Sequence, residues 1–204
     1  MITSDPKKFW NGISKEMDFM KYVYPKRSDK EFEDEGRTQS AFLMPVGIHH
    51  FGTVIDYGCG VGRVTKHFKD YCDRIIGLDI CDRFIEIARS KDKTAEYYTL
   101  DEFKETNIAD YIFCLSVMQH NDKESQIKII NHIYELLKPG GFANIYFAYG
   151  DVYTESDFVH KFTEEEVREL AKSFKAIKIT YGNLVDYKGM TVEGSNELIL
   201  SIKK

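Results

Sequence analysis

The sequence predicts an α/β protein built on a mostly parallel β-sheet. From about residue 54 to residue 149, short apolar runs alternate with amphipathic helical segments, which is typical of parallel strands joined by right-handed helical crossovers. The first apolar run passes into glycines and then into helical spacing, as the first strand and turn of a Rossmann-like unit do. The last two expected strands have no helix between them, so they must be antiparallel. We therefore expect a Rossmann-like, seven-stranded, mostly parallel sheet with a C-terminal antiparallel hairpin and helices on both faces.

Composition narrows the class of protein. The 204 residues are 43% hydrophobic and 30% charged, with a net charge of −5, which indicates one globular domain over residues 1–204. Lysine and arginine form no dense block, so we expect no nucleic-acid partner, because neutralising phosphates needs clustered basic residues. The four cysteines show neither a CxxC pair nor metal-ligand spacing, which favours reduced thiols and no metal site. The sequence contains neither the apolar region of a signal peptide nor an apolar run of the ~20 residues that span a bilayer, so we expect a cytoplasmic protein without a membrane partner.

Residues 1–45 precede the first expected strand and are interpreted as a helical cap on a core of residues 46–204. We expect helices over residues 5–20 and 28–43, the second stopping near Pro45. The first is amphipathic, with one apolar face made of Phe9, Ile13, Met17 and Met20. One interpretation makes the cap a lid with Trp10, Tyr22 or Tyr24 touching substrate; the alternative is that these aromatic side chains are core of a helical flank.

The stretch Val54–Arg63, VIDYGCGVGR, carries the main functional signal. Its glycines, at alternate positions, let the backbone turn sharply and let a ligand lie against the main chain, while the following helix presents free N–H groups. A dinucleotide fingerprint requires a small sixth residue, but here that residue is Arg63. Asp56, two residues before the first glycine, would repel a pyrophosphate and suits an ammonium group. The turn therefore favours a ligand that carries an amine over a dinucleotide.

A second acid follows at the spacing of a nucleoside site. The expected strand Arg74–Ile80 ends in Asp79, 21 residues after Gly58, which is the distance at which a βαβ unit brings a carboxylate to a ribose. The alternative role is capping the next helix, but Asp82 is better placed for that. Asp79 supports a nucleoside without choosing between cofactors, because the same acid would serve NAD.

The remaining expected elements continue the alternation. They are strands over 96–100, 109–117 and 142–149, a helix over 122–138, a helix from the Thr163–Glu166 capping box to about Phe174, and strands over 176–181 and 196–202 joined by a loop over 182–195.

Four motifs in this order and spacing, VIDYGCGVGR, IIGLDI, ADYIFCLSVMQH and LLKPGG, resemble those of the class I S-adenosylmethionine (SAM) dependent methyltransferases that act on small molecules. The resemblance covers roughly residues 36–204. It implies transfer of a methyl group from SAM to a small-molecule oxygen or nitrogen, leaving S-adenosylhomocysteine (SAH). The chain lacks Asn-Pro-Pro-Tyr after the fourth strand and a Cys-Pro pair, which tells against methylation of DNA-base amines, of glutamine and of cytosine C5.

The resemblance also implies a set of site residues. Arg37 would meet the SAM carboxylate, unless it is only a solvated helix charge, and Asp101 would meet the adenine amine, unless it is only a turn acid. The full cofactor-binding set is Arg37, Asp56, Tyr57, Gly58, Cys59, Gly60, Gly62, Arg63, Asp79, Ile80, Leu100, Asp101, Leu115 and Ser116.

Catalysis leaves several alternatives open. If the acceptor is a hydroxyl, a base should remove its proton, and His160 and His120 are the candidates because both follow expected strands. The alternatives are that His120 only forms a hydrogen bond within its turn and that His160 is a surface residue. An amine acceptor needs only an oxygen to hold it, which Asp151 or Asp157 could supply. Two other classes of function remain: a nicotinamide-dependent oxidoreductase, and a SAM-binding regulatory protein without catalysis.

Overall fold

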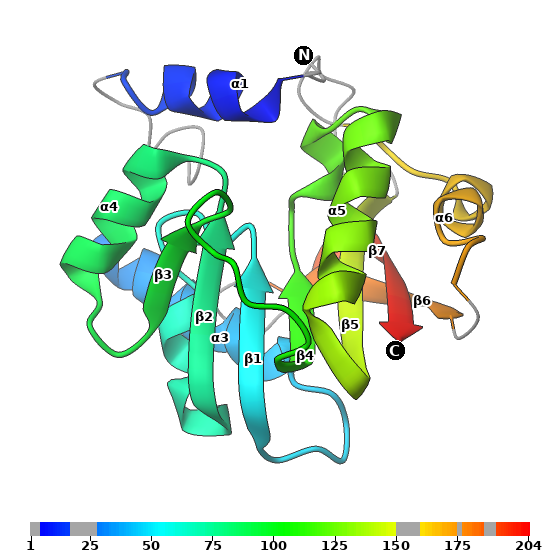
Figure 1. Ribbon diagram of the computed structural model, residues 1–204, viewed down its shortest axis with the longest axis horizontal. Coiled ribbons are helices and arrows are strands. Elements are labelled where there is room, and N and C mark those ends of the chain that lie inside the picture. The colour runs from blue at the N-terminus through cyan, green and yellow to red at the C-terminus, as the bar shows by residue number, and fades with distance from the viewer. Residues whose placement is uncertain (1–4, 17–27, 150–159, 175–176, 186–190) are drawn as a thin grey trace. The chain divides into compact units, whose positions relative to one another are not determined.

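The computed structural model describes residues 5–16, 28–149, 160–174, 177–185 and 191–204, and its sheet has the strand order β3-β2-β1-β4-β5-β7-β6 (Figure 1). The strands are β1 (Phe51–Tyr57), β2 (Cys72–Asp79), β3 (Glu96–Thr99), β4 (Ala109–Cys114), β5 (Leu137–Tyr149), β6 (Ile177–Val185) and β7 (Thr191–Lys203). The helices are α1 (Pro6–Ile13), α3 (Asp29–Leu43), η1 (Thr65–Tyr71), α4 (Asp82–Lys91), η2 (Met118–His120), α5 (Lys123–Leu136) and α6 (Glu164–Leu170). The predicted fold class, a Rossmann-like, mostly parallel sheet with a C-terminal antiparallel hairpin, is confirmed. Several expected positions lie outside the described residues: Met17, Met20, Tyr22, Tyr24, Asp151 and Asp157.

The chain divides into two compact units, one containing Asp5–Lys104 and the other containing Glu105–Leu184 and Thr191–Lys204. The expected cap helices α1 and α3 belong to the same unit as β1, β2 and β3. A single domain over residues 1–204 stays a prediction.

In the first unit, β2 is the central strand. It pairs in parallel with β1 on one side and with β3 on the other. Ile55 and Ile76, which face each other across the β1–β2 pair, are fully buried, as expected for apolar strands covered on both faces. Because the strands are parallel, their carboxyl ends meet at one edge of the sheet, where Tyr57 lies beside Leu78 and Asp79 beside Thr99.

The helices of this unit lie where the sequence predicts them, but the type of one helix and the cap of another differ from the prediction. The segment after Arg63 is a 3₁₀ helix, η1, rather than the expected α-helix. β2 begins directly after η1, so the seven residues of η1 must span the whole distance from the glycine turn to the start of β2. A 3₁₀ helix rises ~2.0 Å per residue, against ~1.5 Å for an α-helix, and therefore spans a greater distance with the same number of residues. The prediction that Asp82 caps α4 is wrong: the cap position is Cys81, whose side chain makes no capping hydrogen bond, and Asp82 is the first helical residue.

In the second unit, β4 pairs in parallel with β5, and β7 pairs with β5 in the antiparallel sense. The expected helix over 122–138 ends at Leu136, since Leu137 already pairs with Ala109 as the first residue of β5. Gly141 allows this close pairing, because a Cβ there would lie 2.5 Å from the Ala109 carbonyl oxygen. Strand also occupies the described parts of the loop expected over 182–195, where hairpin pairing outweighs the turn-forming residues.

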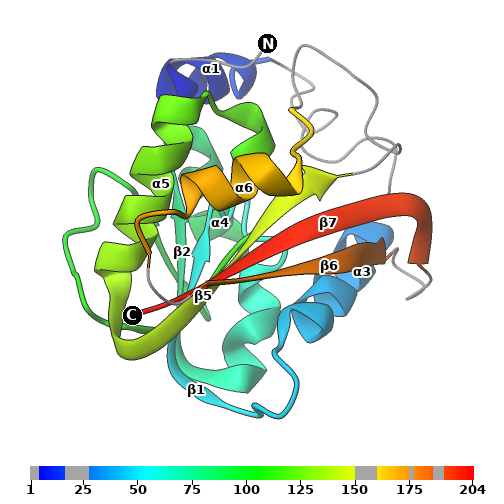
Figure 2. The same cartoon turned by 90° about the vertical axis from the view of Figure 1, so that its right-hand side faces the viewer.

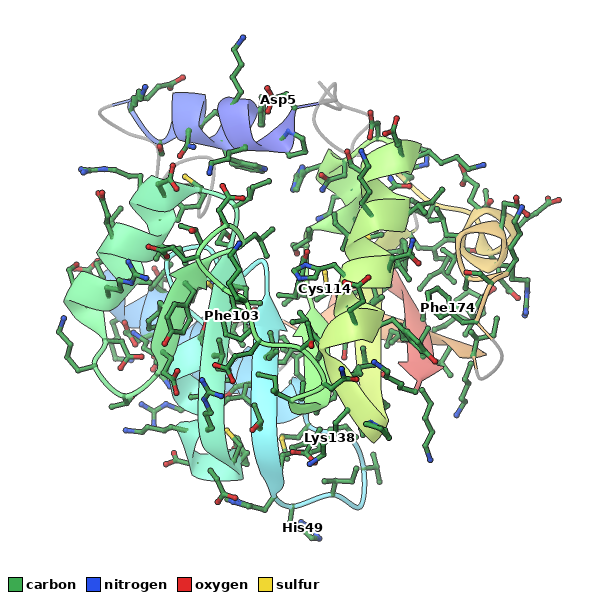
Figure 3. The ribbon with its side chains drawn as sticks, viewed as in Figure 1. Asp5, His49, Phe103, Cys114, Lys138 and Phe174 are labelled. Atoms are coloured by element: carbon green, nitrogen blue, oxygen red, sulfur yellow. The ribbon has the colours of Figure 1, made fainter. Side chains whose placement is uncertain are left out.

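The Thr163–Glu166 capping box is confirmed, although α6 ends at Leu170, earlier than expected. Figure 2 shows α5 and α6 next to each other, and residues of both helices line a pocket of about 760 Å³. The four cysteines are buried and free, as expected; Cys114, at the end of β4, is labelled in Figure 3 among the side chains that fill the interior.

Candidate functional site

The glycine turn after β1 places each of its three glycines in a left-handed backbone conformation. Gly58, Gly60 and Gly62 have φ of 84°, 55° and 80°, a conformation that residues with a Cβ rarely adopt. The amides of Gly58 and Cys59 both donate to the carbonyl oxygen of Leu78, at 2.7 and 2.9 Å. The turn is therefore fixed to the carboxyl end of β2.

The glycines of this turn differ in what surrounds them. A Cβ on Gly62 would lie 2.6 Å from the hydroxyl oxygen of Tyr97, so the absent side chain makes room for a core tyrosine. A Cβ on Gly60 would meet no atom within 4 Å. Gly60 is thus the position where the main chain itself is open to a ligand.

The Asp79 carboxylate lies beside this open position. Its Oδ2 accepts from the Gly60 amide at 2.8 Å and its Oδ1 accepts from the Cys81 amide at 2.8 Å. Burial raises the pKa of Asp79, against the lowering effect of these backbone donors. A carboxylate oxygen can accept more than one hydrogen bond, so both oxygens keep capacity for further donors.

Asp56, in β1, is buried and accepts from the Thr65 hydroxyl at 2.6 Å. Burial raises the pKa of Asp56 to about 7, although the Thr65 hydrogen bond and the charge of Arg63 act in the opposite direction. An adjacent ammonium group would favour the ionised carboxylate. The geometry therefore makes Asp56 an acid whose charge depends on its neighbours at neutral pH.

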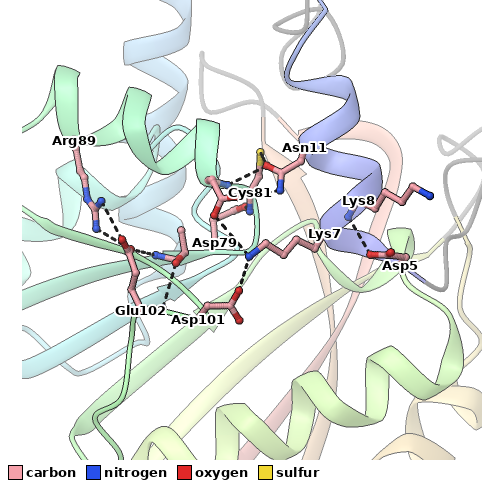
Figure 4. A network of polar contacts seen from close by, with 11 residues as sticks. Asp5, Lys7, Lys8, Asn11, Asp79, Cys81, Arg89, Asp101 and Glu102 are labelled. Atoms are coloured by element: carbon pink, nitrogen blue, oxygen red, sulfur yellow. Dashed lines mark hydrogen bonds and ion pairs between the residues drawn. The ribbon is translucent and has the colours of Figure 1, made fainter.

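The end of β3 carries the expected adenine acid. The Leu100 amide donates to the Asp79 carbonyl oxygen at 3.0 Å, which brings the two strand ends together. The Asp101 side chain is 75% exposed and forms an ion pair with Lys7 of α1 (Figure 4). Lys7 also lies 3.7 Å from Asp82. A basic side chain thus lies between the acids that follow β3 and β2.

The other cofactor-binding candidates of this unit have different surroundings. Tyr57 and Cys59 are buried, whereas Ile80 is partly exposed. The Arg63 guanidinium lies 3.8 Å from the Glu35 carboxylate and 5.8 Å from the centre of the Phe32 ring. The Arg63 side chain therefore packs against α3, and only the backbone of Arg63 is left for a role in cofactor binding.

Arg37 is exposed on α3. Its predicted contact with the SAM carboxylate stays a prediction. The neighbouring Gly36 has a clearer role, because a Cβ there would lie 2.3 Å from the Arg63 carbonyl oxygen, so α3 packs directly on the glycine turn.

In the second unit, Leu115 and Ser116 follow the carboxyl end of β4, and Ser116 has a φ of 57°. His120 ends η2 and its amide donates to the Val117 carbonyl oxygen at 3.2 Å. The Gln126 side chain fixes this turn from α5 by donating to the carbonyl oxygens of Met118 and Asn121, at 3.2 and 2.7 Å. The segment after β4 is thus held by side chain as well as backbone.

His160 belongs to the same unit and is attached to that turn. Its amide donates to the Gln119 carbonyl oxygen at 2.8 Å, and its Nε2 lies 3.2 Å from Glu166 Oε1. The ring packs edge-on against Phe162, with 4.4 Å between ring centres. Burial acts to raise the pKa of Glu166, but Thr163 and His160 together hold it below its ordinary value. The carboxylate can therefore orient the imidazole.

Some polar residues that contact the candidate site are not predicted from the sequence. Lys7 and Asn11 are the clearest, and their i, i+4 spacing on α1, which places two polar side chains on one helix face, was a usable signal. Thr65, the partner of Asp56, has no signal of this kind because the contact depends on the geometry of the turn.

Within the described parts of the chain, no helix combines the length and apolar character needed to cross a membrane.

Comparison with known proteins adds an independent result. A family model described as "Methyltransferase domain" matches residues 54–141. N-demethylindolmycin N-methyltransferase of Streptomyces griseus is 32% identical over 95 residues, which is 43% of this chain and 40% of the relative. Phosphoethanolamine N-methyltransferase 1 of Triticum aestivum is 26% identical over 146 residues, 66% of this chain and 28% of the relative. The chain therefore spans less than half the length of these relatives.

Among solved structures, magnesium protoporphyrin IX methyltransferase of Synechocystis PCC 6803, crystallised with bound SAM, superimposes with a TM-score of 0.68. The match covers 100% of both chains at 17% identity, so it shows a shared fold. The sheet order and the glycine turn thus define a methyltransferase fold. The family match begins in β1 and covers residues 54–141, and the predicted resemblance to the class I SAM-dependent methyltransferases is confirmed.

Proposed function

We propose that this protein binds SAM at the carboxyl ends of β1, β2 and β3 and transfers its methyl group to a small-molecule acceptor. The observation that carries the proposal is the Asp79 carboxylate, held by the Gly60 and Cys81 amides beside the open face of the glycine turn. Two ribose hydroxyls can donate to its remaining lone pairs, and the turn leaves room for the methionine portion at Gly60. The crystal structure with bound SAM that shares this fold supports the choice of cofactor.

The chemistry needs little from the protein beyond alignment. The SAM sulfonium activates the methyl group, and positioning the acceptor can supply ~7 kcal/mol or more of the rate enhancement. A hydroxyl acceptor also needs a base, for which we propose His160 or His120; an amine acceptor does not. The two curated relatives named above are N-methyltransferases, which makes amines the first acceptors to test.

Calorimetric titration tests the cofactor. SAM and SAH should bind to the wild-type protein and NAD should not. Asp79→Ala removes two charge-assisted hydrogen bonds, each worth about 1.5–3 kcal/mol, so the Kd for SAH should rise at least tenfold. Asp73→Ala is the matched control, because Asp73 lies on the same strand with its side chain 77% exposed.

Affinity for SAH that is unchanged in Asp79→Ala would contradict the ribose assignment. Binding of NAD in place of SAM would instead favour the oxidoreductase alternative. Formation of SAH from SAM, measured with a panel of amines and then of hydroxyl compounds, separates an enzyme from a SAM-binding regulatory protein and decides between nitrogen and oxygen as the acceptor atom.

A further inference from the structure

Asn11 of α1 uses both polar atoms of its side chain on the segment that follows Asp79 (Figure 4). Its Oδ1 accepts from the Asp82 amide at 3.2 Å and from the Cys81 thiol at 3.4 Å. Its Nδ2 donates to Asp82 Oδ2 at 3.1 Å. A single amide group thus fixes two consecutive residues.

These contacts replace the missing cap of α4. The first amides of a helix have no partner within it and are usually satisfied by a cap side chain. Cys81, at the cap position, supplies no side-chain hydrogen bond to the first amides of α4. Asn11 accepts from the first helical amide instead, so the start of α4 is completed by a residue 71 positions earlier in the chain.

The same segment orients the predicted ribose acid. The Cys81 amide donates to Asp79 Oδ1 at 2.8 Å, and Asp79 and Cys81 are both buried. A shift of the Cys81–Asp82 segment would move the donor that sets the direction of the carboxylate. Asn11 therefore contacts Cys81, which in turn contacts the carboxylate that would hold the ribose.

α1 is anchored firmly enough for such a role. Trp10 packs on a buried cluster that contains Phe32, Val61, Cys81 and Phe84, with 6.0 Å between the ring centres of Trp10 and Phe84. Lys7, one turn before Asn11, forms an ion pair with Asp101 after β3. Apolar and charged contacts thus hold the helix at the positions one and four residues before Asn11.

We propose that Asn11 is a positioning residue of the nucleoside site: it holds the Cys81–Asp82 segment so that the Asp79 carboxylate keeps its orientation toward the ribose hydroxyls of the cofactor. The assignment rests on the proposed function. It attributes part of the cofactor affinity to a side chain of α1 that touches no reacting atom.

The test is a double-mutant cycle measured by calorimetric titration of the full chain with SAH. Asn11→Ala should raise the Kd about tenfold, while Lys8→Ala, an exposed side chain on the same helix, should leave it unchanged. Because Asn11 acts through Asp79, the Asn11→Ala/Asp79→Ala double variant should bind no more weakly than Asp79→Ala alone. Asn11→Ala should weaken binding of the 2′-deoxy analogue of SAH less than it weakens binding of SAH. A general loosening of the fold would weaken binding of both ligands equally.

A reciprocal exchange keeps the test informative if Asn11→Ala is poorly folded. Asn11→Asp alone places two carboxylates against each other and should weaken SAH binding by more than tenfold. Adding Asp82→Asn restores a donor opposite an acceptor and should recover most of the affinity.

Three results would each overturn the role of Asn11 and leave the proposed function standing. They are additive losses in the cycle, an unchanged Kd in Asn11→Ala, and failure of the reciprocal exchange to recover affinity. A wild-type protein that binds no SAH would overturn the proposed function and this assignment with it.

Discussion

Replacing Asp56 by asparagine should change how the stability of the protein depends on pH. The pKa of this buried carboxyl is raised from 3.8 to about 7 by burial, so between these values the folded protein binds more protons than the unfolded chain. Stability therefore falls as the pH rises through that window and stays lowered above it. Asparagine does not titrate, and its Oδ1 can still accept from the Thr65 hydroxyl. Asp56→Asn should remove the part of the pH dependence that comes from this group.

The magnitude follows from the size of the shift. Each pKa unit corresponds to 1.36 kcal/mol, so the wild-type protein should lose about 3 kcal/mol from this group between about pH 5 and about pH 8. For a chain of this length, that loss is roughly 5–10 °C in Tm. The measurement is thermal and urea unfolding of both proteins across this range, with the exposed Asp70 changed to asparagine as the control.

The difference in stability between Asp56→Asn and wild type should therefore grow with pH in favour of the variant, and the control should show no such trend. A difference that is constant with pH would refute the conclusion that Asp56 is buried with a raised pKa.

Further variants test the glycine turn and the chemical step. Gly62→Ala should destabilise the fold by several kcal/mol, because it combines a left-handed φ of 80° with a Cβ 2.6 Å from the Tyr97 hydroxyl, whereas Gly60→Ala should cost only the backbone strain of about 1 kcal/mol; equal losses in urea unfolding would contradict this ordering. If the acceptor is a hydroxyl, either His160→Ala or His120→Ala should lower turnover ~10²–10⁴-fold with little change in the Kd for SAH. Wild-type rates in both variants would indicate catalysis by positioning alone and favour an amine acceptor.

The sequence by itself determined the order of strands and helices and most of the cofactor-binding candidates. Such features are local: buried strands are predicted by apolar runs, a helix start by the Thr163–Glu166 box, and a sharp turn by glycines at alternate positions, all of which the structure reproduces. Element ends were less predictable. β5 begins at Leu137 because that residue finds a partner in Ala109, and pairing between strands is not encoded at either position alone.

Only the tertiary structure decided which side chains serve the site and which serve the core. Gly62 and Gly60 are equivalent in the motif, yet Tyr97, far along the chain, fills the space beside one of them. Asp82 had the spacing of a helix cap, but Asn11 takes over that role and binds the Asp82 carboxylate as well. These outcomes depend on contacts between residues some 35 to 70 positions apart, and only the folded arrangement of the chain brings such residues within hydrogen-bonding distance.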